Sequence, residues 1–335
     1  MPPEVRILAL AADLPGEPVD LGTQLGCSEA ELRQSTGIAV RHHSADGEGP
    51  SALAERAARE ALARAGVAAD EISMVLFATA TPDVSFPGAA CFLQDRLGLG
   101  TTPGLDIRAQ SAGFLCGLDL AEAFCSNSGP LHARPLLLAA GEVLSSGLDL
   151  TPRGRELSSR LADGAAVAVV GVGQSGFAVR ALDWATDGTL VEQFWCEAPN
   201  SRRMGGRVLL SDFEAGSIYP RADLPALAAI ARERLAAAIA QVLERAGWQA
   251  SQVDLAIVDW IEPQVADEAA SLAGLKAGSR LVVPTRRFGH VLAAGLPIAL
   301  AQEMPHLDAG ARVVLAAAGP GFSWGAAAIE LGKLS

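Results

Sequence analysis

Short apolar runs alternate with longer amphipathic stretches through the first half of the chain. The runs are short and bounded by polar residues or glycine, which is typical of strands, and the longer stretches have the helical period. The expected strands are 6–10, 74–78, 136–140 and 165–172, and the expected helices are 52–65, 88–97 and 112–123. Because 165–172 is an unbroken apolar run, we expect that strand to be covered on both faces.

The second half repeats this order. The expected strands are 177–182, 255–258, 280–283, 312–317 and 324–330, and the expected helices are 224–246, 263–273 and 290–303. Two α/β halves in a similar order indicate an internal duplication without sequence identity. We expect an N-terminal half at 1–174 and a C-terminal half at 175–335, with the polar, Gly- and Arg-containing stretch 187–220 running over the surface.

Composition narrows the class of protein. The 335 residues correspond to about two domains, and 50% of them are hydrophobic. The net charge of −12 opposes a broad nucleic-acid surface. Five cysteines without a C-x-x-C pair indicate a reduced chain with neither a disulfide framework nor a metal site. No signal peptide or membrane span is recognised, so we expect a cytoplasmic protein with no membrane partner.

Four segments carry a resemblance to a known family. They read FATATPDVSFPGAACFLQDRLGL (77–99), LDIRAQSAGFLCGL (105–118), SSRLADGAAVAVVG (158–171) and GPGFSWGAAAIEL (319–331). In this order and spacing they resemble the β-ketoacyl-acyl-carrier-protein synthase III family. The resemblance implies the thiolase fold, in which two duplicated βαβαβ-type halves form five layers, α-β-α-β-α. It also implies a homodimer and an acyl-thioester substrate, with no bound cofactor.

The family keeps a nucleophilic cysteine in a D-x-x-A-A-C-A-G-F segment. Here that segment is D-I-R-A-Q-S-A-G-F, and the matching residue is Ser111. Ser111 lies between a strand end at 107–109 and the helix 112–123, where a sharp turn exposes a side chain and helix N–H groups can stabilise an oxyanion. Alternatively, Ser111 is only a helix N-cap or the remnant of a lost nucleophile.

The family's other two site residues are a histidine and an asparagine. Their positions match Asp259 and His290, so Cys, His and Asn become Ser111, Asp259 and His290. A serine hydroxyl needs a base, an imidazole supplies one near neutral pH, and a carboxylate orients the imidazole. The three residues therefore predict a Ser–His–Asp triad, and the alternative is decay of the site.

The same changes oppose the family's condensation. Decarboxylative condensation needs neutral donors on an enolate oxygen, and a carboxylate at Asp259 would repel that anion. We expect an acyltransferase that moves an acyl group through a Ser111 ester, from a carrier-protein or coenzyme A thioester to an acceptor of a specialised biosynthetic pathway. The alternatives are a thioesterase or esterase, and a non-catalytic partner subunit of an active ketosynthase.

Further residues are expected to bind substrate or carrier. The resemblance implies that Phe86 and Gly321 line the acyl pocket, while Pro320 lacks the N–H that the C-terminal turn would offer an oxyanion. Glu31 and Ser35 stand where many relatives have a coenzyme A-binding Trp and Arg, which favours a carrier-protein donor. Candidate docking residues for an acidic carrier protein are Arg202, Arg203, Arg207, Arg286 and Arg287.

Overall fold

The computed structural model describes residues 4–127, 129, 132–202, 207–275 and 279–332. The first half contains β1 (Glu4–Asp13), α1 (Gly22–Leu25), α2 (Glu29–Thr36), α3 (Pro50–Ala65), η1 (Ala69–Glu71), β2 (Val75–Ala78), α4 (Ala89–Arg96), β3 (Gly104–Ile107), η2 (Gln110–Ala112), α5 (Gly113–Cys125), β4 (Leu136–Val143), η3 (Ser145–Gly147), α6 (Arg155–Ser158) and β5 (Asp163–Gly173). Here η denotes a short 3-10 helix.

The second half contains the same kinds of element. These are β6 (Phe177–Thr186), η4 (Gly188–Gln193), β7 (Phe194–Trp195), α7 (Leu210–Ala215), β8 (Arg221–Ala222), α8 (Leu224–Ala246), η5 (Ala250–Gln252), β9 (Leu255–Asp259), α9 (Pro263–Leu272), β10 (Arg280–Val282), α10 (Pro284–Phe288), η6 (Leu292–Ala294), α11 (Gly295–Glu303), η7 (Met304–His306), β11 (Arg312–Gly319) and β12 (Ser323–Leu331).

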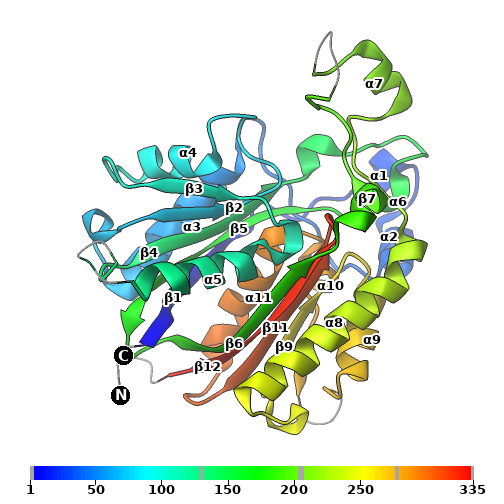
Figure 1. The fold of residues 1–335 in the computed structure, drawn as a ribbon. Helices are drawn as coiled ribbons and strands as arrows, with labels where there is room; N and C mark the ends of the chain where they lie inside the picture. The colour runs from blue at the N-terminus through cyan, green and yellow to red at the C-terminus, as the bar shows by residue number, and fades with distance from the viewer. Residues whose placement is uncertain (1–3, 128, 130–131, 203–206, 276–278, 333–335) are drawn as a thin grey trace.

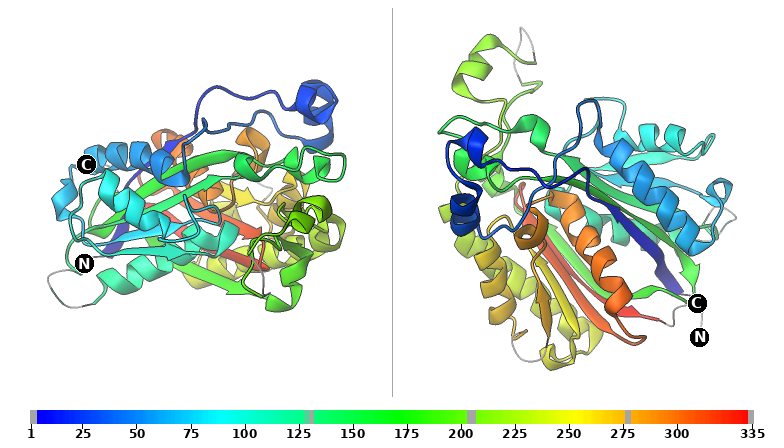
Figure 2. Two further views of the ribbon diagram at one scale, coloured as in Figure 1. Left: turned by 90° about the horizontal axis from the view of Figure 1, so that it is seen from above. Right: turned by 180° about the vertical axis from the view of Figure 1, so that it is seen from behind.

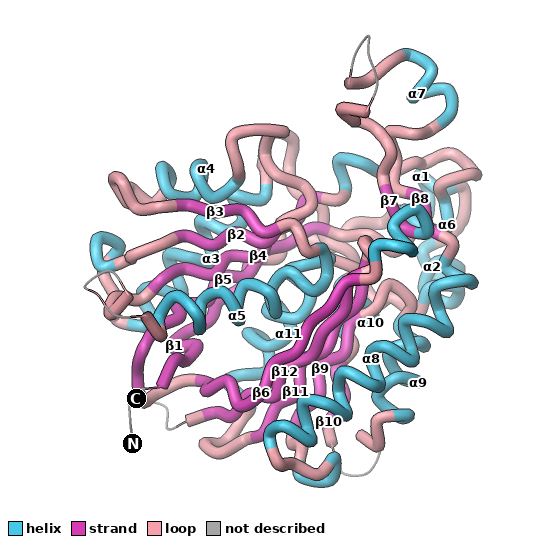
Figure 3. Tube along the Cα trace, viewed as in Figure 1, coloured by secondary structure: helices cyan, strands magenta, loops and turns pink. Residues whose placement is uncertain are grey.

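The long strands of the described residues form one mixed sheet in the order β10-β9-β11-β12-β6-β1-β5-β4-β2-β3 (Figures 1 and 3). The order read outward from β1 and the order read outward from β6 match strand by strand. Each half has parallel pairs at its outer edge and antiparallel pairs toward the middle. The two halves join where Arg6 pairs with Ala178 and Ile7 with Phe177. The sheet therefore shows the internal duplication that the order of elements predicts.

Helices cover the outer face of each half of this sheet and also lie between the two halves, which gives a layered structure. On one outer side α3 packs on β1, β4 and β5, and α4 packs on β2 and β3; on the other, α8 packs on β6, β11 and β12. Between the halves, α5 contacts both β4 and β6, and α11 contacts both β1 and β9 (Figures 1 and 2). The expectation of five α-β-α-β-α layers is confirmed, and the two central helices are buried from both sides.

One expected helix is wrong at its start. The sequence pattern predicts a helix over 290–303, but α11 begins only at Gly295. His290 instead forms an isolated bridge with Leu161, and the chain then turns through η6, where Leu292 has a φ of 37°. A non-glycine residue in that left-handed region interrupts an α-helix. His290 is therefore in an extended segment ahead of the helix.

Residues 187–202 and 207–220 leave the layered body, as expected from the composition of this stretch. The stretch carries η4, β7 and the short helix α7, which extends away from the layers of the ten-stranded sheet (Figure 1), and β8 follows directly after the stretch. Among the described residues, no helix is both long enough and apolar enough to cross a membrane.

Candidate active site

Ser111 lies in the turn between β3 and α5, within η2. The residue before it, Gln110, has a φ of 51°, which reverses the chain and is uncommon outside glycine. The N-cap position of α5 is Ala112, with no capping side chain, so the alternative that Ser111 is only an N-cap is wrong. Ser111 is fully buried, and its Oγ has no hydrogen-bond partner among the described residues. Its hydroxyl is thus not engaged in a hydrogen bond within the described part of the chain.

His290 is held by its backbone to the segment before β5. Its N–H donates to the Arg160 carbonyl over 2.7 Å, and its carbonyl accepts from the Ala162 N–H over 3.1 Å. Gly289, with a φ of 83°, allows this close approach, since a Cβ there would lie 2.6 Å from the Ala162 Cβ. The imidazole is fully buried, and its Nε2 has no partner among the described residues.

Asp259 ends β9 and is also fully buried. Its Oδ2 lies 3.6 Å from His290 Nδ1, longer than a hydrogen bond. Between the two stands Thr285, a residue that the sequence analysis missed. The Thr285 hydroxyl donates to Asp259 Oδ1 over 2.6 Å and is 3.1 Å from His290 Nδ1. The imidazole and the carboxylate are therefore linked mainly through a threonine hydroxyl.

The elements that carry Ser111 and His290 are in contact. η2 packs against η6, and a Cβ on Gly113 would lie 3.1 Å from the Ala293 Cβ. β11 connects Asp259 to the same place, because its Ala317 pairs with Asp259 and its last residue, Gly319, lies against Ser111. The three residues singled out from the sequence thus come from segments that meet between the two halves.

The turn after β11 borders Ser111. A Cβ on Gly319 would collide with the Ser111 hydroxyl and lie 2.8 Å from the Ser111 Cβ. Ser323 Oγ lies 3.0 Å from the carbonyl oxygens of both Pro320 and Ala109 and shares its one hydrogen between them, which holds this turn beside the strand end before Ser111. Gly321, expected to line the acyl pocket, lies in this turn, and its pocket role stays a prediction.

Phe86 is exposed over 78% of its surface. It follows the loop after β2 and precedes α4, at the outer edge of the sheet that β3 forms. A side chain this exposed is not enclosed by the described residues, and the role of Phe86 in an acyl pocket stays a prediction.

The candidate docking arginines differ in availability. Arg202 is exposed, with its guanidinium 5.2 Å from the centre of the Trp195 ring, and Arg207 is exposed. Arg203 lies outside the described residues. Ion pairs already engage the other two: Arg286 with Asp267 over 3.1 Å, and Arg287 with Glu303 over 2.5 Å. Carrier docking at these arginines stays a prediction.

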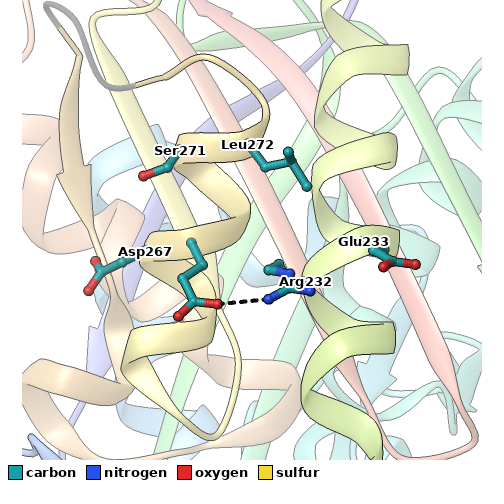
Figure 4. A pocket seen from close by; sticks show the side chains of 6 residues that line it. Arg232, Glu233, Asp267, Ser271 and Leu272 are labelled. Atoms are coloured by element: carbon teal, nitrogen blue, oxygen red, sulfur yellow. Dashed lines mark hydrogen bonds and ion pairs between the residues drawn. The ribbon is translucent and has the colours of Figure 1, made fainter.

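Other features of the described residues do not compete with this site. Burial, with the nearby Asp119 charge, raises the pKa of the Cys116 thiol to about 11, which opposes formation of the nucleophilic thiolate. A surface hollow between α8 and α9 contains the Arg232–Glu268 ion pair and none of the three site residues (Figure 4). No group of three or more potential metal ligands is found in the described part of the chain.

Family models and known proteins agree with this architecture. Residues 105–188 match the model for 3-oxoacyl-[acyl-carrier-protein (ACP)] synthase III, and 243–331 match the model for its C-terminal part. A β-ketoacyl-[acyl-carrier-protein] synthase III of Rhodospirillum centenum is 32% identical over 98% of this chain and 100% of its own. That of Bacillus pumilus is 28% identical over 94% of each chain.

Solved structures extend the likeness to three dimensions. The 3-oxoacyl-(acyl carrier protein) synthase III of Pseudomonas aeruginosa is 28% identical, with a TM-score of 0.86 over 98% of this chain and 99% of that one. The Aquifex aeolicus enzyme is 25% identical, with a TM-score of 0.84 over 97% and 99%. The fold is thus the thiolase fold expected from the motifs, and the chain belongs to the β-ketoacyl-acyl-carrier-protein synthase III family.

Proposed function

We propose that this member of a family of acyl-transferring enzymes moves an acyl group through a Ser111 ester and does not condense. The observation that carries the proposal is the buried His290, whose Nδ1 side faces Thr285 and Asp259 while its Nε2 has no hydrogen-bond partner among the described residues. An imidazole oriented in this way can act as a base toward a neighbouring hydroxyl. Ser111 is buried on the adjoining turn with no hydrogen-bond partner in the described part of the chain, and its hydroxyl is the one that we assign to this base.

The proposed reaction has two steps. In the first, His290 Nε2 takes the Ser111 proton while the Ser111 oxygen bonds to the thioester carbonyl carbon. The carbon–sulfur bond then breaks, and the proton passes from Nε2 to the departing thiolate. In the second, Nε2 takes a proton from the acceptor, the acceptor bonds to the acyl carbon, and Ser111 recovers its proton. The N-terminus of α5 favours the negative charge that develops on the carbonyl oxygen.

Asp259 is the reason to separate this reaction from condensation. By motif it occupies the family's histidine position, where a donor would face an enolate oxygen. The Thr285 hydroxyl and N–H both donate to Asp259 Oδ1, an arrangement that suits a carboxylate. A carboxylate is an acceptor only and repels an enolate, whereas behind an imidazole it stabilises the imidazolium.

A carrier-protein thioester is the proposed donor, with a coenzyme A thioester as the alternative. Glu31 stands at the motif position of the coenzyme A-binding tryptophan. It is part of a capping box on α2, in which its carboxylate accepts from the Ser28 N–H over 2.8 Å. This residue therefore offers a negative charge in place of a stacking ring. Exposed Arg202 and Arg207 on the stretch 187–220 are the cations that we propose for docking.

We also propose that two chains form a homodimer. β3 is an edge strand, and Leu105 on it is 51% exposed. Phe86 lies on the loop next to it, since the Asp106 carboxylate of β3 accepts from the N–H of Ala89. Exposed apolar residues beside an unpaired strand edge are suited to pairing with a second copy.

Product analysis tests the proposed function. The protein is incubated with acetyl and malonyl thioesters of a carrier protein or of coenzyme A, while thiol, carbon dioxide and free acid are followed. Transfer predicts stoichiometric thiol release without carbon dioxide and only slow free-acid release until an alcohol or amine acceptor is added. Asp259→Asn should slow this thiol release, and Asp46→Asn, which changes an exposed carboxylate, is its matched control.

Each other outcome identifies an alternative. Carbon dioxide with a 3-ketoacyl product would contradict the proposal and favour condensation. Steady free-acid release that no acceptor alters would favour a thioesterase or esterase. If no donor gives thiol release, and His290→Ala behaves as the wild type does, a partner subunit is favoured.

A further inference from the structure

We propose that Thr285 is a positioning residue through which Asp259 orients His290. The inference rests on the proposed function, because it concerns how the base toward Ser111 is held. It starts from the distances: Asp259 Oδ2 and His290 Nδ1 are 3.6 Å apart, whereas Thr285 Oγ1 is 2.6 Å from the carboxylate and 3.1 Å from the imidazole. The two shorter distances are hydrogen-bond distances, and the direct one is not.

Counting hydrogens fixes the direction of both bonds. A carboxylate only accepts, so the single Thr285 hydroxyl hydrogen is donated to Asp259 Oδ1. Thr285 Oγ1 then has only lone pairs for the imidazole, and His290 Nδ1 must carry a hydrogen and donate it. In a neutral imidazole with Nδ1–H, Nε2 has the free lone pair. The relay therefore selects the tautomer in which Nε2 is a base.

The surroundings hold Thr285 in this role. It is fully buried in the first turn of α10, where its own N–H also donates to Asp259 Oδ1 over 3.3 Å. A β-branched side chain has restricted rotation about χ1, so its hydroxyl is held between its two partners. Gly295, at the start of α11, leaves the other carboxylate oxygen its space, since a Cβ there would lie 2.5 Å from Asp259 Oδ2.

The relay also acts when His290 takes the proton of Ser111. The imidazolium keeps its Nδ1–H bond to Thr285, and the Thr285 hydroxyl dipole stays directed to the Asp259 carboxylate. Charge on the ring is then stabilised without a change of hydrogen-bond partners, as preorganised groups do. Losing the hydroxyl would leave Nδ1 with only the longer contact to Asp259.

Rates of single-turnover acylation test this role. Thr285→Val keeps the shape and removes the hydroxyl, and we expect it to slow acylation about a hundredfold with thioester affinity unchanged. Thr285→Ser, which keeps the hydroxyl, should restore most of the rate. If Asp259 acts through Thr285, the double variant Thr285→Val/Asp259→Asn should be no slower than the slower single variant.

The tautomer itself is measured by nitrogen-15 NMR of histidine-labelled protein. The wild type should show His290 protonated at Nδ1, with the signal assigned by its loss in His290→Asn. This readout does not depend on whether Thr285→Val folds. A resting His290 protonated at Nε2 alone would overturn the relay, and so would a folded Thr285→Val that acylates at the wild-type rate.

The relay and the proposed function can fail separately. If Ser111→Ala abolishes acylation while Thr285→Val leaves it intact, the relay is wrong and the Ser111 mechanism stands. If Ser111→Ala is still acylated at the wild-type rate, the proposed function is wrong whatever Thr285 does.

Discussion

Glycines leave the space that the polar side chains of the site occupy. Gly319 lies against the Ser111 hydroxyl, and Gly295 lies against the Asp259 carboxylate. Neither has a positive φ, so alanine is compatible with the backbone at both positions and only the added methyl group matters. At this scale, shape around the reacting groups is as decisive as the identity of those groups.

Gly319→Ala should therefore displace Ser111 and leave the rest of the protein intact. Its methyl group would overlap the Ser111 hydroxyl, and a displacement of about 1 Å can slow a reaction about a hundredfold. Single-turnover acylation and thermal unfolding are measured together. Gly188→Ala is the control, because a Cβ there meets nothing within 4 Å. Equal rates for the two variants would contradict the packing described around Ser111.

At the scale of residues, the sequence could predict the site residues that stand in recognisable family motifs. Ser111, Asp259 and His290 stand in recognisable segments, and the structure brings those segments together. Thr285 has no such signal: it precedes His290 by five residues and follows a proline, and only the fold shows that its hydroxyl meets Asp259. The ion pairs of Arg286 and Arg287 were equally unpredictable, since their partners lie 19 and 16 residues away in the sequence.

At the scale of elements, α4 begins without a capping side chain of its own. Its N-cap is Gly88, and Asp106 of β3 supplies the acceptors instead, with both carboxylate oxygens 2.8 Å from the N–H groups of Ala89 and Ala90. A Cβ on Gly88 would lie 2.5 Å from that carboxylate. The strand thus caps the helix and fixes where the Phe86 loop ends.

Asp106→Ala should lower the free energy of unfolding by about 1–2 kcal/mol, since it leaves two N–H groups at a helix N-terminus without an acceptor. Asp106→Asn keeps one acceptor oxygen and should lose less. Urea unfolding measures both, with the exposed Asp46→Ala as a surface control. A loss for Asp106→Ala no greater than that of the control would contradict the capping role.

A buried carboxyl group connects three further elements. Glu142, in β4, is fully buried and accepts from the Thr81 hydroxyl over 2.7 Å and from the Ala80 N–H over 3.0 Å. Burial raises its pKa to about 7, although these donors, a further bond from Thr79 and one from the Ala293 backbone act in the opposite direction. Glu142 thus ties the loop after β2 to η6, close to His290.

Stability should depend on pH through this group. A carboxyl pKa raised from 4.5 to about 7 means that the folded state retains a proton that the unfolded chain releases. The resulting stabilisation is complete below pH 4.5 and is lost as the pH rises through about 7. Relative to Glu142→Gln, the wild type should lose about 2–3 kcal/mol of unfolding free energy between pH 5 and 8. Urea unfolding measures both proteins. If their unfolding free energies change equally between pH 5 and 8, the raised pKa of Glu142 is contradicted.

The ends of helices were predictable where a capping residue, a proline or a glycine marks them. α8 occupies the expected 224–246 because Asp223 caps it, Pro225 stands in its first turn and Gly247 ends it. The expected helix 290–303 failed at its start because η6 contains no glycine or proline to mark the left-handed Leu292. η6 packs against η2 of the other half, a long-range contact that the local sequence does not encode.

At the scale of the molecule, the same device occurs in both halves. η2 and η6 each precede a central helix, and each begins with a non-glycine residue of positive φ. These residues are Gln110, with a φ of 51°, and Leu292, with a φ of 37°. Ser111 lies in one turn and His290 just before the other. The duplication therefore supplies two similar turns that meet in the middle layer, and the site combines one from each half.

A homodimer is the prediction that belongs to this scale. We expect sedimentation at twice the chain mass of 34.4 kDa. Leu105→Glu places a charge on the exposed edge strand and should shift the protein to the monomer mass. Leu272→Glu, at a residue 63% exposed on α9, is the matched control and should stay dimeric. A monomeric wild type, or equal dissociation of both variants, would contradict this interface.

The large-scale architecture was predictable because strand and helix order repeats and because four motifs keep their spacing. The join of the two halves was not. β1 and β6 meet in only two register pairs, at Arg6 and Ile7, and no feature of either strand's sequence marks them as neighbours. Pairing between segments 170 residues apart depends on the packing of the central helices rather than on local pattern.

The central claim is that Ser111 carries the acyl group, and the most direct test is the intact mass of the protein. Wild type and Ser111→Ala are incubated briefly with short acyl thioesters of carrier protein and of coenzyme A, with thiol release followed in the same samples. The account predicts one acyl increment on the wild type, mapped to the peptide that contains Ser111, and none on Ser111→Ala. An increment retained by Ser111→Ala, or neither adduct nor thiol release from the wild type with any of these donors, would contradict it.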